Sequence, residues 1–316
     1  MSLIEQAAKR LEQLRQAGVE LPEALPAPDK PAYERRPGQQ PVISENSPLS
    51  NAMQSKQGVA AEAPPSPVQT SRLVNLDLDA MTAAGLLTPI AARSKLADDF
   101  RVIKRPLIAN AMGKGVPPVA NGNLIMVTSA LPGEGKSFSA INLAISIAME
   151  LDNTVMLVDA DVARPSVLNM LGLPPARGLL DVVDKDSVDI SDVLLRTNIE
   201  KLTILPSGTQ HPRATELLAS ESMVRLLDDM ASRYPDRIII FDSPPLLLTT
   251  ESRALATHMG QVIVIVHAGH TAQAAVKEAL RTINACPVKM MVLNQSRETT
   301  SGGYGYGYGY GYGSDA

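Results

Sequence analysis

Residues 127–137, which read VTSALPGEGKS, constrain the fold of this chain more than any other stretch. The apolar run 124–127 before them is typical of a buried strand, and apolar side chains recur at helical spacing after them. A strand, a loop with glycines and the start of a helix are together the context that a phosphate-binding loop requires. The stretch therefore predicts a nucleotide-binding domain of the α/β class.

Several residues of this loop have the chemistry to hold a nucleotide. Gly133 and Gly135 let successive backbone N–H groups turn toward an anion, and the start of the following helix adds its positive end. Lys136 is expected to reach the β- and γ-phosphates of ATP, and the Ser137 hydroxyl is expected to bind Mg²⁺. Ala130 stands where the usual first glycine does, so a plain glycine turn with a solvated lysine is the alternative. The predicted nucleotide-binding segment comprises Pro132, Gly133, Glu134, Gly135, Lys136, Ser137 and Phe138.

Short apolar runs alternate with amphipathic helical stretches along the rest of the chain. The predicted strands cover residues 155–158, 202–205, 238–241, 262–266 and 288–293. This alternation predicts a mainly parallel sheet with helices on both faces, and such sheets bind their ligands at the carboxyl ends of the strands. We expect Thr271 to cap the helix between the last two strands.

Three aspartates lie at this expected ligand-binding edge. Asp159 and Asp242 each follow an apolar run, and Asp161 comes two residues after Asp159. Mg²⁺ prefers oxygen ligands and keeps several waters, so we expect Ser137, Asp159 and Asp242 to hold the metal ion. Asp159 has an alternative role as the base that takes a proton from an attacking hydroxyl, and each acid alone could be a strand-end cap. Arg164, close to these acids in sequence, suits either a phosphate or a subunit interface.

The segment between residues 71 and 106 is predicted to add a strand and two helices to the domain. The strand is expected over residues 72–78 and the helices over 79–87 and 95–104, with Pro106 ending or kinking the second helix. Asp98, Arg101 and Lys104 recur every three residues on its polar face. The default interpretation is a solvent-exposed face with local ion pairs.

The two ends of the chain differ from its middle in composition. Residues 1–20 are predicted to contain an amphipathic helix, which either docks on a membrane-protein partner or an anionic bilayer or packs on the protein's own core. Residues 21–70 are rich in proline and poor in large apolar side chains, so we expect a disordered linker. The folded domain is expected over residues 71–300. Residues 301–316 alternate glycine with tyrosine and are expected to be a disordered tail.

Charge and composition narrow the function classes. A net charge of −4 and a predicted pI of about 5.7 give no reason to expect a nucleic-acid partner. Cys286 is the single cysteine, which excludes an internal disulfide and fits a reducing compartment. No apolar run approaches the ~18–20 residues of a membrane helix, and the N-terminus lacks a signal-peptide core. We therefore expect a cytoplasmic protein that reaches a membrane through a partner or an amphipathic segment.

Together, these motifs resemble those of the bacterial tyrosine kinases. Residues 130–137 (ALPGEGKS), 157–165 (LVDADVARP) and 238–245 (IIIFDSPP) are similar to the Walker A, A′ and B motifs of that family. Residues 205–220 and the terminal tyrosine cluster are also similar, so the resemblance covers about residues 90–312. The sequence looks most like the cytosolic autokinases of exopolysaccharide loci, of the exosortase-associated type. Ala163 departs from the family pattern, which often has arginine there.

The resemblance implies a P-loop NTPase fold of the MinD/ParA-like kind and an ATP- and Mg²⁺-dependent protein-tyrosine autokinase. It implies catalytic roles for Lys136, Asp159, Asp161 and Asp242, and a place near adenine for Asn294. The implied phosphoacceptors, modified between subunits, are Tyr304, Tyr306, Tyr308, Tyr310 and Tyr312.

The resemblance also implies partners and a cellular role. The family's oligomerisation helix would fall on Asp98, Arg101 and Lys104, two of which are conservative departures, and would build a ring-shaped homo-oligomer. A membrane chain-length-determinant (co-polymerase) protein would activate the kinase at the inner face of the cell membrane, and a tyrosine phosphatase would reverse it. The process served would be the control of exopolysaccharide chain length and export.

Three other functions fit parts of the sequence. The first is a MinD/ParA-like regulatory ATPase without protein kinase activity, but Leu131 stands where such proteins carry a lysine. The second is a scaffold that binds nucleotide without catalysis, which leaves the three acids and Lys136 without a role. A dinucleotide-binding oxidoreductase fits least, because no G-x-G-x-x-G opens a helix.

Overall fold

The computed structural model describes residues 71–114, 117–184, 187–233 and 236–296. The predicted N-terminal helix and linker (residues 1–70) and the tyrosine-bearing tail (residues 301–316) lie outside the described residues. Most of the predicted folded domain lies within them.

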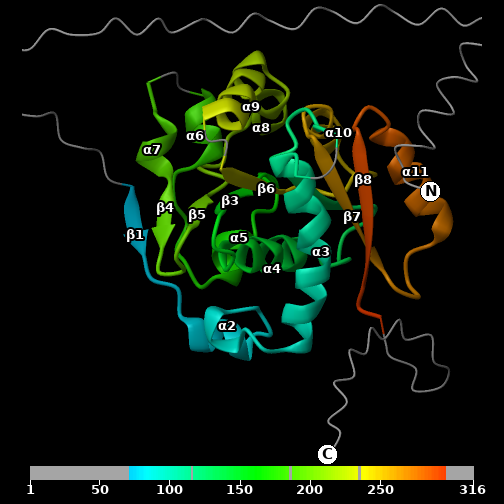
Figure 1. Cartoon of the computed structure of the whole chain (residues 1–316). Helices are drawn as coiled ribbons and strands as arrows, with labels where there is room; N and C mark the ends of the chain where they lie inside the picture. The colour runs from blue at the N-terminus through cyan, green and yellow to red at the C-terminus, as the bar shows by residue number, and fades with distance from the viewer. Residues whose placement is uncertain (1–70, 115–116, 185–186, 234–235, 297–316) are drawn as a thin grey trace, which may run out of the picture. The chain divides into compact units, whose positions relative to one another are not determined.

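The described strands form one eight-stranded sheet in the order β1-β4-β5-β3-β6-β2-β7-β8 (Figure 1). All neighbouring strands are parallel except β4 and β5. The strands are β1 (Arg72–Val74), β2 (Leu124–Ser129), β3 (Thr154–Asp159), β4 (Leu195–Thr197), β5 (Leu202–Leu205), β6 (Arg237–Asp242), β7 (Gln261–His267) and β8 (Val288–Asn294). The predicted mainly parallel sheet is confirmed, whereas the antiparallel β4 was not predicted.

Helices cover both faces of this sheet. They are α2 (Leu78–Ala83), the 3₁₀ turn η1 (Pro89–Ala91), α3 (Lys95–Met112), α4 (Lys136–Ala148), α5 (Val167–Met170), α6 (Leu179–Asp184), α7 (Ile190–Val193), α8 (Ala214–Leu218), α9 (Glu221–Arg233), α10 (Thr250–Ala256) and α11 (Gln273–Thr282). The two cores follow the two-residue period of a strand. On β2, Leu124 and Met126 pack with α6, α9 and α11, while Ile125 and Val127 pack with α3 and α4. This confirms the predicted layers.

Helix α3 does not end at Pro106, which excludes one of the two predicted effects of this proline, an end or a kink. It continues to Met112 and ends at Gly113, whose φ of 61° is the left-handed conformation of a helix C-cap. The proline removes the hydrogen bond to the carbonyl of Val102, a residue that is 73% exposed and whose turn of the helix faces water. Phe100 and Leu107 are buried on either side of the break, so packing holds the helix together across it.

The residues of the predicted polar face of α3 differ in burial, since two of them are exposed to solvent and one is buried. Asp98 and Arg101 form an exposed ion pair, as expected. Lys104 is only 5% exposed, contrary to the prediction, because its stem packs beneath α4. Its Nζ donates to the carbonyl of Ser146 at 2.5 Å and pairs with the Glu150 carboxylate at 2.6 Å. Lys104 therefore ties α3 to the C-terminal end of α4.

Replacing Lys104 by alanine is expected to lower the free energy of unfolding by about 1–3 kcal/mol, because the buried stem and two polar contacts are lost. Arg101→Ala, on the same helix, removes an exposed pair and should change stability by less than about 0.5–1 kcal/mol. Urea denaturation of both variants makes the comparison. Equal losses of stability would contradict the role of Lys104 as a tie between the helices.

Candidate active site

The phosphate-binding loop joins β2 to α4, as predicted. Gly133 and Gly135 have φ values of 80° and 90°, a region that residues with a side chain rarely adopt. A Cβ on Gly135 would also collide with the side-chain amide of Asn294. The first turn of α4 has no side-chain cap, so its N–H groups stay available to an anion.

Glu134 braces the loop from within. Its side chain is buried, and its Oε2 accepts the N–H of Leu131 at 2.7 Å. Its Oε1 accepts the Thr271 hydroxyl, and its backbone carbonyl accepts Asn294 Nδ2 at 2.9 Å. The prediction that Thr271 caps α11 is wrong, because Ala272 occupies the N-cap position. Asn294 lies beside the loop, and its contact with adenine remains a prediction.

The structure brings the predicted catalytic residues together from three elements. Asp159 and Asp242 are directly paired at the carboxyl ends of β3 and β6, because these parallel strands are neighbours in the sheet. Lys136, the first residue of α4, lies between two acids. Its Nζ is 2.8 Å from Asp161 Oδ2 and 3.9 Å from Asp242 Oδ1. The sequence predicted each of these residues from its own local motif. The order of the strands in the sheet then brings them together at one edge.

The two strand-end acids retain buried oxygens that accept no hydrogen bond. Asp159 Oδ2 accepts the backbone N–H groups of Ser166 and Val167 at 3.1 and 3.0 Å, which leaves Oδ1 buried and unbonded. Both carboxylate oxygens of Asp242 are buried without a hydrogen bond. Unpaired buried carboxylate oxygens are costly unless a ligand completes them.

These oxygens fit a divalent cation. Ser137 Oγ, 2.9 Å from the hydroxyl of Ser166, lies beside the acids as a further oxygen ligand. Ser166 was missed in the sequence, although it directly follows the Walker A′-like stretch. Among the described residues no three His, Cys, Asp or Glu side chains form a metal site by themselves. A cation here would therefore need phosphate and water ligands as well, which is how Mg²⁺ binds beside nucleotides.

Burial and mutual repulsion shift the titration of these acids. The pKa of Asp159 is raised to about 7, mainly by burial and next by the neighbouring Asp242, while the backbone N–H groups of Val167 and Ser166 oppose the shift. Burial raises the pKa of Asp242 to about 6, against the effect of the Lys136 ammonium. Burial lowers the pKa of Lys136, but Asp242 and Asp161 outweigh this and raise it above its ordinary value. The site therefore holds the Lys136 ammonium beside two buried acids, Asp159 and Asp242, whose pKa values are raised to about 7 and about 6.

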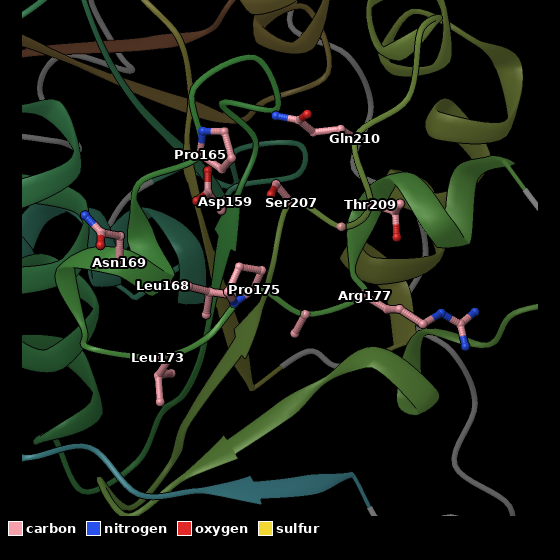
Figure 2. A pocket seen from close by; sticks show the side chains of 12 residues that line it. Asp159, Pro165, Leu168, Asn169, Leu173, Pro175, Arg177, Ser207, Thr209 and Gln210 are labelled. Carbon is pink, nitrogen blue, oxygen red and sulfur yellow. The ribbon is translucent and has the colours of Figure 1, made fainter.

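Two cavities adjoin the acids from different sides. One, of about 510 Å³, is lined by Lys136, Asp161 and Arg164 together with Gly133 and prolines of the neighbouring loops. The other, of about 590 Å³, has Asp159 among its lining residues (Figure 2). Figure 2 shows Asp159 next to Pro165 and Ser207, with Leu168, Pro175 and Leu173 extending away from it.

Comparison with known proteins identifies the kind of enzyme to which this site belongs. A family model described as an AAA domain matches residues 122–295. The tyrosine-protein kinase YwqD of Bacillus subtilis (strain 168) is 32% identical over 167 residues, which are 53% of this chain and 69% of YwqD. The chain belongs to the bacterial tyrosine-protein kinase family. The resemblance and the enzyme class predicted from the sequence are thereby confirmed.

Two further similarities extend this assignment. The succinoglycan biosynthesis transport protein ExoP of Rhizobium meliloti (strain 1021) is 28% identical over 219 residues, which are 68% of this chain but only 27% of ExoP. The crystal structure of the chimerical protein CapA2B2 has a TM-score of 0.56 and 27% identity, and the match covers 66% of this chain and 89% of that one. The chain thus shares the fold of the solved CapA2B2 structure, and its match spans about a quarter of the length of ExoP.

None of the helices in the part of the chain that the structure describes is both long and apolar enough to pass through a bilayer.

Proposed function

We propose that this chain is an ATP- and Mg²⁺-dependent tyrosine autokinase that phosphorylates Tyr304, Tyr306, Tyr308, Tyr310 and Tyr312 of a neighbouring copy. One observation carries the proposal. Lys136 is held between Asp161 and Asp242 at the open start of α4, beside buried carboxylate oxygens that accept no hydrogen bond. This arrangement suits a transferring phosphoryl group and its cation.

Each part of the site has a role in this proposal. The loop N–H groups and the start of α4 hold the phosphates, and the Lys136 ammonium stabilises the negative charge of the transferring group. Ser137 and Asp242 hold Mg²⁺, which when bound neutralises charge on the phosphate oxygens. Asp159, oriented by the backbone N–H groups of Ser166 and Val167, serves as the base.

The transfer balances without any further reactant. The phenol oxygen forms a bond to the γ-phosphorus, the bond from that phosphorus to the β,γ-bridging oxygen breaks, and ADP leaves with the bonding electrons. The phenol proton passes to Asp159 Oδ1 and from there to solvent. An ordinary phenol has a pKa of about 10, so a nearby base or cation is needed at neutral pH.

We infer the partners from the resemblance and from the similarity to ExoP, a succinoglycan biosynthesis transport protein. The proposed activator is a membrane chain-length-determinant protein at the inner face of the cell membrane. The proposed assembly is a ring of identical chains, formed through the exposed Asp98–Arg101 side of α3. A tyrosine phosphatase is proposed to remove the phosphate groups from the tyrosines. The process is the control of exopolysaccharide chain length and export.

Incubation of the full chain with labelled ATP and Mg²⁺, followed by phosphopeptide mapping, tests the proposal. Label is expected on the tail tyrosines and should be lost when a chelator removes the metal ion. Nucleotide hydrolysis without labelled tyrosine would favour a regulatory ATPase instead.

Transfer between chains is expected to appear in a mixture of two defective proteins. One carries Lys136→Met with an intact tail, and the other is catalytically intact but lacks residues 301–316. Phosphate should appear on the tail of the Lys136→Met chain, at a rate that rises with the concentration of the active chain. Each protein alone is the control. An unlabelled mixture, beside a parent chain that labels itself, would show that transfer occurs only within one chain.

A further inference from the structure

Strand β8 forms one edge of the sheet and lies beside α11 (Figure 1). In the part of the chain that the structure describes, it hydrogen-bonds to β7 alone, so the backbone groups along its other side meet no strand there. Proteins usually protect such an edge with a short strand, charged residues, proline or a bulge. β8 instead has seven residues, VKMMVLN, with one lysine and no proline. This edge is therefore suited to accept a further strand.

The face of β8 toward α11 carries two exposed apolar side chains. Met291 and Leu293 are 61% and 64% exposed, whereas Met290 and Val292, which alternate with them, pack against the core on the opposite side of the sheet. A groove of about 560 Å³ runs between this face and α11. Its apolar lining residues are Val266, Val276, Leu280, Met291 and Leu293. A strand that covers this groove needs large side chains on one face only.

The chain continues from β8 into a segment that has this pattern. Glycine and tyrosine alternate from Gly303 to Gly313. Because successive side chains of a strand point to opposite faces, a strand of this sequence has every tyrosine on one face and only glycine on the other. The tyrosine face matches the groove in chemistry, since an aromatic ring buries apolar area and keeps its hydroxyl at the wet end. The glycine face requires no covering helix.

The connection after β8 allows the tail to return along the strand. Gln295, the residue after β8, has a φ of 57°, a left-handed conformation in which the chain turns. Residues 295–303 provide a connection of nine residues, whereas about two residues suffice for an antiparallel hairpin. A tether of this length gives the tail an effective concentration on the order of mM at the edge. The chain's own tail is therefore favoured over that of a second copy at lower protein concentrations.

We propose that the unmodified tail docks on its own chain as an antiparallel strand beside β8, with tyrosine rings in the groove. β8 has three positions on this face, and Tyr304, Tyr306 and Tyr308 are the first tyrosines of the returning chain. Their rings cover Met291 and Leu293.

A docked tail limits the proposed transfer between copies. Tyrosines that lie along β8 cannot at the same time occupy the site of a neighbouring copy, so the edge of the sheet competes with that site for the tail. Ordering glycine costs more chain entropy than ordering any other residue, which keeps the docking reversible. The docking needs no nucleotide, and it does not rest on the proposed kinase function.

Limited proteolysis with chymotrypsin, which cleaves after tyrosines that it can bind in an extended chain, tests the docking. The full chain is treated with a phosphatase, kept free of nucleotide and digested briefly, and mass spectrometry identifies each cleaved tyrosine. Cleavage after Tyr304 and Tyr306 should be at least about 10-fold slower than in a free peptide of residues 301–316, because buried rings cannot enter the protease. Met291→Asp should raise this rate at least about 5-fold, since a carboxylate then faces the rings.

Two controls separate docking from other causes of slow cleavage. Leu151→Asp places the same charge on a leucine that is 86% exposed and does not line the groove, so it should leave the rate unchanged. A tail of the same composition whose tyrosines stand in adjacent pairs should be cleaved as fast as the tail of the Met291→Asp chain, because its rings fall on both faces of a strand. A melting curve of each variant verifies that the fold is intact.

Three results would overturn the proposal. A parent tail that is cleaved as fast as the free peptide would show that no docking occurs. Slow cleavage that persists in both the Met291→Asp chain and the paired-tyrosine tail would place the tail elsewhere. Protection that grows with protein concentration would indicate a second copy at the edge in place of the chain's own tail. Failure of the labelling experiment, by contrast, would contradict the kinase function and leave this docking intact.

Discussion

Replacing Lys136 by methionine is expected to lower autophosphorylation at least about 100-fold, because the ammonium that stabilises the transferring phosphoryl group is lost. The structure strengthens this expectation. Lys136 Nζ is held within 2.8 Å of Asp161 Oδ2, so the charge is fixed in position before nucleotide binds. A charge that is already in position needs no rearrangement during the transfer. A mobile lysine would first have to be ordered, which would raise the activation free energy.

The measurement is the initial rate of label incorporation from ATP. Lys277→Met, an exposed lysine on α11, is the matched control and should retain the parent rate. A melting curve of each variant shows whether the fold survives. Near-parental labelling by the Lys136→Met chain would rule out this loop as the catalytic phosphate site.

Replacing Asp242 by asparagine is expected to change activity and stability in opposite directions. Activity should fall about 100-fold or more, since the carboxylate proposed to hold Mg²⁺ becomes neutral. Nucleotide affinity should fall more with Mg²⁺ present than without it. Calorimetric titrations under the two conditions measure this difference, and an equal loss in both would argue against a metal ligand.

The stability of the nucleotide-free protein should rise instead. The folded pKa of Asp242, about 6, lies above its unfolded value, so the native state binds the extra proton between about pH 4 and 6. Stability contributed by this group is therefore present below pH 4 and is lost as pH rises through 6. Asparagine does not ionise, so the variant avoids this loss of stability at high pH. Its free energy of unfolding should be about 1–3 kcal/mol greater than that of the parent at pH 8, and the difference should be smaller at pH 4.

Urea denaturation at the two pH values tests this sign. Asp228→Asn, at an exposed position on α9, is the control and should show no such pH-dependent gain. A variant less stable than the parent at pH 8 would indicate that Asp242 makes stabilising contacts as a carboxylate.

The sequence alone determined the elements that carry the chemistry. The apolar runs before Asp159 and Asp242 predicted two strands, and the glycines before Lys136 predicted the curled loop, because these signals lie within a few neighbouring residues. The edge at which the acids meet also followed, since parallel strands present their carboxyl ends together. The kinase family could likewise be inferred from the three short motifs.

Only the tertiary structure decided the contacts between distant parts of the chain. Lys104 has the spacing of an exposed residue, yet α4 covers it and supplies its partners. Pro106 carries a local signal to end a helix, which packing on either side outweighs. Thr271 looks like a cap but bonds to Glu134, 137 residues earlier, and the cavity beside Asp159 forms where loops after β3 and β5 meet. Periodicity and turn preference are set by near neighbours, whereas burial and hydrogen-bond partners depend on which elements the folded sheet brings together.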